Sequence, residues 1–277
     1  MDCKMVVLDL DGTLLNDEKT ISDKNAHILN ELHKQGVHIV IATGRNYYMA
    51  KILIEGIKLT EPVILANNGA VVRRYVNDEF IESNYLDFSI FEKIYEQGLK
   101  HGLNPIIHVD EYHKGYDIIY ECENYEEVYR GYIKKDYKRT KHQKFKEEEI
   151  KNILSVCYFN EYQKLLEFKN EIEKIPGEFN IILNQNLRNW SLLELLNING
   201  CKWRALKKYI DSIGIDAAQV IAMGDDNNDI ELIKNSGFGI AMKNATDKLK
   251  DASDSISRAS NNESGVYYEL SEIFKIK

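Results

Sequence analysis

Short apolar runs alternate with amphipathic stretches in the first part of the chain. Residues 5–10, 37–43 and 62–66 are mainly hydrophobic, as expected for strands that are buried on both faces. The stretch after the first run has apolar residues at helical spacing between Ser22, a typical N-cap, and Gly36, a typical helix end. This alternation is typical of βαβ units and predicts a parallel sheet covered by helices.

The same alternation returns near the C-terminus. Residues 201–214 predict a helix, residues 219–225 a strand and residues 228–237 another helix. Because both ends of the chain show the same alternation of strands and helices, we expect them to form one domain together. We therefore expect a Rossmann-like, doubly wound α/β core with a parallel sheet, formed by residues 1–85 and 189–277.

Residues 86–188 have a different pattern. Helical stretches are mixed with alternating or isolated strands, such as residues 104–109 and 153–159. This mixture predicts an α+β domain with an antiparallel sheet, inserted between the two halves of the core.

Composition and charge limit the class of protein. With 277 residues, 44% hydrophobic and 29% charged, the chain is long enough for a large core. No run approaches the ~20 apolar residues of a membrane-spanning helix, so no membrane partner is expected. The net charge of −8 argues against a dedicated nucleic-acid binder, and the charged stretch 134–149 is expected to be a solvated surface. Four widely spaced cysteines predict reduced thiols and a cytoplasmic location, whereas the oligomeric state stays open.

Asp9 and Asp11 stand where the first apolar run ends, and Gly12 allows a sharp turn beside them. Two like charges at the end of a buried strand are unfavourable unless something compensates them. In open α/β sheets, ligands bind beyond the carboxyl ends of the strands. Clustered carboxylates favour Mg²⁺ or a similar hard cation. A capping role explains either aspartate alone but not the pair, so we expect a metal site here.

A second acidic cluster follows the strand that ends near residue 224. The spacing of Asp225, Asn227 and Asp229 fits the opening of an EF-hand calcium loop. The rest of that loop does not fit, because Ile230 replaces the turn glycine and Ser236 the bidentate glutamate. The cluster is better explained as the other half of the first site, since parallel strands bring their ends side by side.

Two further features add positive potential. Thr43 and Gly44 follow an apolar strand, and a hydroxyl with exposed backbone N–H groups at such a turn can bind an anion. Lys202 begins a predicted helix, where a positive charge is unfavourable because it opposes the helix dipole. This unfavourable position suggests that the lysine has a functional role. Alone, the turn could be an ordinary cap and the lysine an exposed side chain.

Together these elements suit attack on a phosphate monoester. A carboxylate that attacks phosphate must overcome repulsion between two anions, and a metal, a lysine and an N–H cradle counteract it. One aspartate can be the covalent nucleophile, and another can protonate the leaving oxygen and later activate water.

The motifs, in this order, resemble the haloacid dehalogenase superfamily of phosphatases, and the long insert resembles its Cof-type, sugar-phosphatase-like branch. They are DLDGTLL from Asp9, IATGR from Ile41, NNGA from Asn67, then Lys202 and GDDNND from Gly224. Dehalogenases of this superfamily lack the second aspartate, so Asp11 favours phosphoryl transfer.

The resemblance implies a role for each acidic residue. Asp9 is expected to be the nucleophile and a Mg²⁺ ligand. Asp11 is expected to be the general acid and base and to bind the metal through its backbone carbonyl. Asp225 is expected to be a further Mg²⁺ ligand, and Asp229 to support the metal site from outside its ligand shell.

The resemblance also implies a phosphate site and a cap. Thr43, Gly44, Lys202 and Asn228 are expected to bind the phosphoryl group. The inserted domain is expected to act as a cap that selects the leaving group.

The resulting prediction is a Mg²⁺-dependent phosphatase for small phosphorylated metabolites such as sugar phosphates, acting through a phospho-aspartate. A phosphotransferase or phosphomutase of the same superfamily is an alternative. A receiver-like regulatory domain is another, although it leaves the insert unexplained. The substrate, the cap residues that select it and a redox role for Cys201 stay open.

Overall fold

The computed structural model describes residues 2–55, 62–124, 132–133, 137–147, 149–187 and 190–276. Part of the charged stretch 134–149 and the two residues at the expected boundary, 188 and 189, lie outside these residues. The chain forms two compact units. The core unit comprises Met1–Glu82 and Cys201–Lys277, and the inserted unit comprises Ser83–Gly200.

The inserted unit extends further toward the C-terminus than the expected boundary at residue 188. Strand β11 (Trp190–Asn197) pairs antiparallel with β9 (Ile153–Asn160) and with β10 (Phe179–Leu187). It therefore belongs to the sheet of the inserted unit, although we expected residues from 189 onward in the core.

The core unit contains an eight-stranded sheet in the order β14-β13-β12-β1-β2-β3-β4-β5. Its strands are β1 (Met5–Leu8), β2 (His38–Ala42), β3 (Val63–Ala66), β4 (Val71–Arg74), β5 (Phe80–Ser83), β12 (Val220–Gly224), β13 (Phe238–Ala241) and β14 (Ser255–Ile256). Its helices are α1 (Asp23–Lys34), α2 (Tyr47–Ile54), α6 (Lys202–Ser212), α7 (Ile230–Asn235), α8 (Asp247–Ala252) and α9 (Gly265–Phe274).

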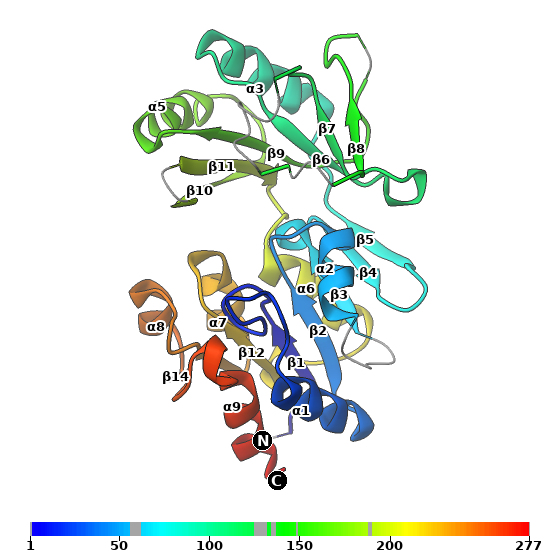
Figure 1. Ribbon diagram of the computed structural model, residues 1–277, viewed down its shortest axis with the longest axis vertical. Helices are drawn as coiled ribbons and strands as arrows, with labels where there is room; N and C mark the ends of the chain where they lie inside the picture. The colour runs from blue at the N-terminus through cyan, green and yellow to red at the C-terminus, as the bar shows by residue number, and fades with distance from the viewer. Residues whose placement is uncertain are drawn as a thin grey trace. The chain divides into compact units, whose positions relative to one another are not determined.

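Six neighbouring strands, from β14 to β3, are parallel, and β4 adds an antiparallel strand beside β3. From the centre, the chain moves one way through β1-α1-β2 and the other way through β12-α7-β13 (Figure 1). Because such crossovers are right-handed, the two directions place α1 and α7 on opposite faces of the sheet. This topology confirms the predicted doubly wound α/β fold.

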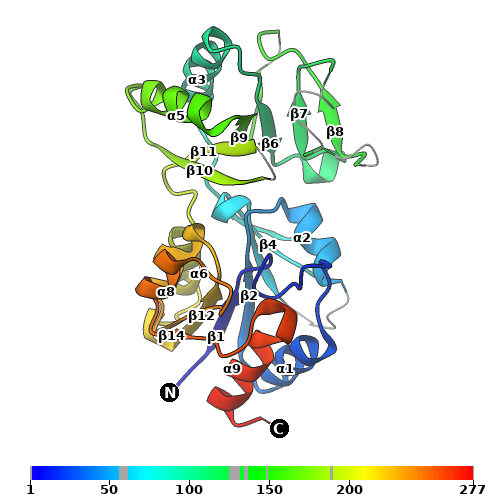
Figure 2. The same cartoon turned by 60° about the vertical axis from the view of Figure 1, so that its left-hand side comes forward.

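Local sequence signals set the helices that cover this sheet. The Ser22 side chain accepts a hydrogen bond from the Asn25 backbone N–H and caps α1, as its sequence position predicts. Helix α9 packs along α1, and the two lie side by side in both views (Figure 2). The strands between the helix layers are buried, which explains why they are almost continuously apolar.

The inserted unit contains a six-stranded sheet in the order β10-β11-β9-β6-β7-β8. Its further elements are β6 (Ile106–Val109), β7 (Ile118–Tyr120), β8 (Thr140–His142), α3 (Phe88–Lys100) and α5 (Tyr162–Ile172). Its pairs are antiparallel except β7 with β8, which is parallel.

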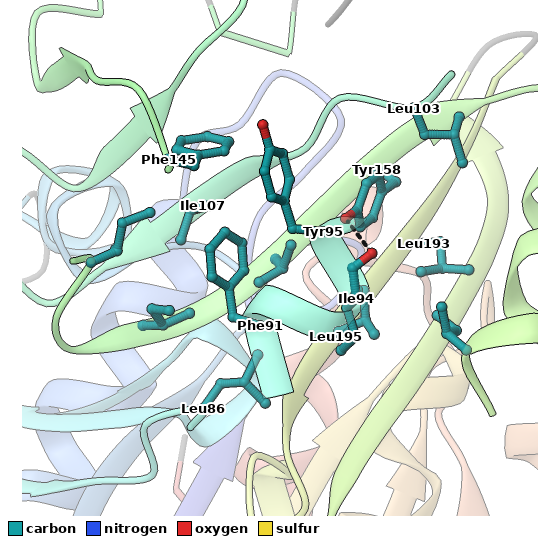
Figure 3. Close-up of a cluster of buried hydrophobic side chains, with 14 of the residues drawn as sticks. Leu86, Phe91, Ile94, Tyr95, Leu103, Ile107, Phe145, Tyr158, Leu193 and Leu195 are labelled. Atoms are coloured by element: carbon teal, nitrogen blue, oxygen red, sulfur yellow. Dashed lines mark hydrogen bonds between the residues drawn. The ribbon is translucent and has the colours of Figure 1, made fainter. Parts of the chain in front are cut away.

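Helices α3 and α5 cover one face of this sheet, and aromatic and aliphatic side chains fill the space between (Figure 3). The largest fully buried member of this cluster is Tyr158, whose hydroxyl donates a hydrogen bond to the carbonyl of Ile94. In the same cluster, the rings of Phe91 and Tyr95 stack, and the ring of Phe145 meets both of them edge-on. The inserted unit thus has its own hydrophobic core.

Within the described residues, no helix is long and apolar enough to cross a membrane.

Candidate active site

Four adjacent parallel strands carry the predicted site residues to one edge of the core sheet. Strands β12, β1, β2 and β3 are neighbours, and Leu8 is in register with both Met223 and Ile41. The segments that follow these strands therefore begin side by side. The Asp9 N–H donates to the carbonyl of Met223, which fixes the start of the first segment against the strand that precedes Asp225.

Asp9, Asp225 and Asp229 form one acidic cluster. One carboxylate oxygen from each lies within 4.8 Å of the other two. Asp9 and Asp229 are buried, whereas Asp225 is half-buried. Three carboxylate oxygens this close together are a ligand set suited to a hard divalent cation.

Two glycines allow the carboxylates to lie this close to the backbone. A Cβ on Gly12 would stand 2.2 Å from Asp225 Oδ2, and a Cβ on Gly224 would stand 2.5 Å from Asp229 Cγ. Gly12 also has a φ of +79°, which favours glycine. The Thr13 hydroxyl adds a hydrogen bond of 3.3 Å to Asp225 Oδ1.

Lys202 lies against this cluster. Its Nζ donates to Asp9 Oδ1 at 2.6 Å and to Asp229 Oδ1 at 2.7 Å, and the whole side chain is buried. Burial alone would lower the pKa of the lysine, but the charges of Asp229 and Asp9 outweigh it and raise the pKa. The first residue of α6 is therefore a buried cation, which explains its unfavourable place at a helix start.

The single positive charge of Lys202 does not neutralise the three acidic side chains. Burial raises the pKa of Asp9 well above its usual range, and the charges of Asp229 and Asp225 add to this effect while Lys202 opposes it. Burial, followed by the charge of Asp229, raises the pKa of Asp225 to about 7. A cation among these oxygens would favour the ionised form of both groups. The donor set thus fits a divalent metal.

Asp229 also organises the loop that carries Asp225. Its Oδ2 accepts hydrogen bonds from the backbone N–H groups of Asp225 and Asp226, at 3.1 and 3.2 Å. With Oδ1 bound to Lys202, both oxygens of this fully buried carboxylate have partners.

The carboxylate of Asp11 lies outside the group of three. It accepts hydrogen bonds from Arg45 Nε at 2.5 Å, Arg45 Nη2 at 2.7 Å and Lys19 Nζ at 2.6 Å. Burial raises the pKa of Asp11, but the hydrogen bonds and charges of Arg45 and Lys19 outweigh it and lower the pKa to about 2. In this conformation Asp11 is ionised at neutral pH.

The turn at Thr43 and Gly44 connects β2 to α2. Thr43 is buried, and its hydroxyl oxygen accepts a hydrogen bond from the Arg45 N–H, whereas Gly44 is exposed. Asn68 links this turn to Asn228: its N–H donates to the Thr43 carbonyl, and its Oδ1 accepts from Asn228 Nδ2, both at 2.9 Å. Thr43, Gly44 and Asn228, all predicted to bind phosphate, are thereby joined.

Cys201, directly before Lys202, donates a hydrogen bond from Sγ to Glu231 Oε2 at 3.1 Å. Burial raises the pKa of this thiol, and the Glu231 carboxylate adds to the effect. A thiol with a raised pKa is a weak nucleophile, which favours an inert cysteine.

Sequence reasoning assigned no role to Arg45, Lys19 or Asn68. Arg45 belongs to the IATGR motif and Asn68 to the NNGA motif, so their membership of these motifs was the sequence feature that could have pointed to them. Lys19 gives no signal in the sequence, because its contact with Asp11 depends on how the loop after β1 folds back.

Comparison with known proteins points to one family. The family model described as haloacid dehalogenase-like hydrolase matches residues 6–270. The chain is 30% identical to the 5-amino-6-(5-phospho-D-ribitylamino)uracil phosphatase YcsE of Bacillus subtilis (strain 168), over 92% of this chain and 90% of that protein. It is 28% identical to YwtE, which has the same name and comes from the same organism, over 98% of both chains.

A solved structure agrees with these sequence relatives. The crystal structure of a haloacid dehalogenase-like hydrolase from Bacteroides thetaiotaomicron superposes with a TM-score of 0.81 at 26% identity, covering 98% of this chain and 100% of that one. The names of the relatives support hydrolysis of phosphoric monoesters as the reaction class of this enzyme. The chain belongs to the haloacid dehalogenase-like hydrolase family.

Proposed function

We propose that this enzyme is a Mg²⁺-dependent phosphatase that hydrolyses small phosphate monoesters through a phosphoryl group carried on Asp9. The observation that carries the proposal is the cluster of Asp9, Asp225 and Asp229 around Lys202. With all three carboxylates ionised, this group has an excess of two negative charges, which suits one divalent cation.

Asp9, Asp225 and the backbone carbonyl of Asp11 would hold the metal, and Asp229 would orient Asp225 through the loop N–H groups. When bound, Mg²⁺ would supply positive charge to the phosphoryl oxygens. Lys202 would add a positive charge beside the nucleophile, and the Thr43–Gly44 turn and Asn228 would supply neutral donors.

The reaction would have two steps. In the first, an Asp9 oxygen attacks phosphorus, the bond to the leaving oxygen breaks, and Asp11 gives that oxygen a proton. In the second, Asp11 takes a proton from water, the water oxygen attacks phosphorus, and Asp9 leaves with its carboxylate restored. The first step requires a protonated Asp11, so the contact with Arg45 would have to break as the substrate binds.

The proposed substrates are small phosphorylated metabolites such as sugar phosphates. The relatives YcsE and YwtE are named for a phosphoribitylaminouracil, which is a molecule of this size and class. The inserted unit, with its separate core, would act as the cap that selects the leaving group.

A phosphate-release screen tests the proposal. Purified protein is assayed with sugar phosphates, nucleotides, cofactor phosphates and p-nitrophenyl phosphate, with Mg²⁺ or with EDTA. We expect repeated turnover of several small monoesters that needs Mg²⁺ and no acceptor other than water. Release only with a second acceptor would indicate a phosphotransferase, and a single turnover would indicate a receiver-like domain. No release from any compound would refute the proposal.

A further inference from the structure

Asn68 has an unusual backbone conformation at the sheet edge that carries the site. It lies in the short 3₁₀ turn Asn67–Gly69, directly after β3, with φ 54° and ψ 31°. This is the left-handed region, which few residues other than glycine adopt and which asparagine tolerates best. Such conformations persist only where the surrounding structure holds them, and they are concentrated at functional sites.

The contacts of Asn68 reach two predicted phosphate-binding segments. Its N–H donates to the carbonyl of Thr43, and its Oδ1 accepts a 2.9 Å hydrogen bond from Asn228 Nδ2. Its Oδ1 also stands 3.4 Å from the point where a Cβ on Gly44 would lie. The side chain is therefore buried between the Thr43–Gly44 turn and the loop of Asn228.

The next residue brings the same turn against a third segment. A Cβ on Gly69 would lie 2.8 Å from the carbonyl oxygen of Cys201, the residue before Lys202. The turn is thus fixed between the start of α6 and the segment after β2.

The neighbouring Asn67 provides a contrast within one turn. It is also left-handed, with φ 47°, and also buried. Its two side-chain polar atoms, however, have no hydrogen-bond partner in the described part of the chain. The two adjacent asparagines thus share the left-handed backbone conformation. Of the two, it is Asn68 whose carboxamide is hydrogen-bonded to Asn228, a residue predicted to bind the phosphoryl group.

We propose that Asn68 is a positioning residue that orients the Asn228 carboxamide toward the phosphoryl group and stabilises the Thr43–Gly44 turn. This inference rests on the proposed function. An amide NH₂ group has two donors, and Asn68 Oδ1 accepts a hydrogen bond from one of them. The second donor of Asn228 is then directed to an oxygen of the substrate. Asn68 acts through Asn228 and does not itself contact the reacting atoms.

A double-mutant cycle tests this coupling. The variants N68G, N228A and N68G/N228A are compared with wild type in Mg²⁺-dependent hydrolysis of p-nitrophenyl phosphate. Glycine suits the left-handed backbone, so N68G removes the carboxamide without adding strain. We expect N68G and N228A each to lower kcat about tenfold, with the double variant no slower than N228A, because the loss of one hydrogen bond to a neutral group is of that size.

The variant N68D tests the same position by charge. Aspartate tolerates the left-handed region and keeps an acceptor for Asn228, but it places a negative charge beside the phosphate site. We expect its KM for p-nitrophenyl phosphate and its inhibition constant for orthovanadate to rise about tenfold or more. Because Asn68 is buried, the added charge should also lower the melting temperature, so the kinetics are measured well below the unfolding transition of N68D. The matched control is N67G, which changes the adjacent left-handed asparagine and should leave kcat and KM unchanged.

Several results would overturn the inference. It fails if N68G has wild-type kcat, if N68G slows the N228A background as much as the wild-type background, or if N67G has the same effect as N68G. It also fails if N68D binds orthovanadate as wild type does. If the wild type is active and the Asn68 variants have the same kcat and orthovanadate binding as the wild type, only this inference is rejected. A wild type that neither turns over nor binds orthovanadate with Mg²⁺ rejects the proposed function as well.

Discussion

The two units bury charged side chains in different ways. In the inserted unit, Asp117 and Arg139 form a two-pronged pair, with Nε to Oδ2 at 2.5 Å and Nη2 to Oδ1 at 3.1 Å. The Tyr137 hydroxyl donates to the same carboxylate, and Arg139 also donates to the carbonyl of Tyr112. One negative charge meets one positive charge there, and their hydrogen bonds are satisfied. In the core unit, Lys202 bonds two carboxylates, Asp9 and Asp229, and a third carboxylate, that of Asp225, lies close to both.

The difference separates a structural ion pair from a reactive site. A balanced, hydrogen-bonded pair has little need of a further ligand, and it serves to hold β8 near the turn before β7. A cluster with excess negative charge is unfavourable in a buried place unless a cation or a proton joins it. The core unit is therefore where we expect metal binding and chemistry, and variants of both groups can test this distinction.

The largest difference should come from removing one carboxylate in each unit. Asp9→Asn removes the proposed nucleophile, so kcat should fall by more than about a thousandfold. Asp117→Asn breaks the balanced pair, so it should lower the free energy of unfolding by roughly 2 kcal/mol and change kcat less than about twofold. Phosphate-release kinetics and urea unfolding of both variants measure the contrast. Equal losses of activity would contradict it.

A pair of glycines should give the next largest effect. In Gly12→Ala, the new Cβ would collide with Asp225, so we expect kcat/KM to fall about a hundredfold and the Mg²⁺ requirement to rise. Gly36 has a similar φ of +84° but no atom within 4 Å of its Cβ position. Gly36→Ala should therefore cost only about 1 kcal/mol of stability and leave activity unchanged. A Mg²⁺ titration of activity in both variants measures this contrast. A wild-type Mg²⁺ dependence in Gly12→Ala would contradict the proposed metal site.

Asp11 should show its role through the leaving group. Asp11→Asn cannot donate a proton, so turnover of alkyl phosphates, whose leaving oxygen is basic, should fall about 100-fold or more. Turnover of p-nitrophenyl phosphate, which has a good leaving group, should fall much less. A plot of rate against leaving-group pKa for wild type and variant measures this effect. Equal losses across the series would argue against proton transfer by Asp11.

The smallest effect should be a pH dependence of stability without metal. The folded protein keeps a proton on Asp225 up to about pH 7, whereas the unfolded chain loses it near pH 4, so stability should fall as the pH rises between these values. The fall should amount to roughly 3 kcal/mol between pH 5 and pH 8. Asp225→Asn should lessen this fall without abolishing it, because Asp9, whose pKa is also raised, still contributes. Mg²⁺ should reverse the fall in wild type. Urea unfolding in EDTA at pH 5 and pH 8 measures it, and an unchanged slope in Asp225→Asn would contradict the account.

The sequence predicted the acidic cluster because two rules of parallel sheets act together. Apolar strands mark where each strand ends, and neighbouring parallel strands end at one edge, so Asp9 and Asp225 had to approach each other. The predicted fold class follows from the same alternation of strands and helices. These features depend on the pattern and not on individual side-chain directions.

Other features depend on details that periodicity does not encode. The carboxylate of Asp11 turns away from the cluster to Arg45 and Lys19, and spacing along the chain does not determine side-chain direction. Strand β11 could be recognised as a strand, but its pattern does not say which sheet it joins, so the expected boundary was misplaced. The contact between Asn68 and Asn228 joins residues far apart in the sequence through a turn that propensity does not predict.

The central claim is that Asp9 carries the phosphoryl group, and mass spectrometry can test it directly. Wild-type enzyme is quenched with acid during turnover of p-nitrophenyl phosphate with Mg²⁺, and its peptides are mapped. We predict a phosphoryl group on Asp9, absent in EDTA and absent from Asp9→Asn. A phosphoryl group on another residue, or rapid phosphate release by Asp9→Asn, would contradict the account.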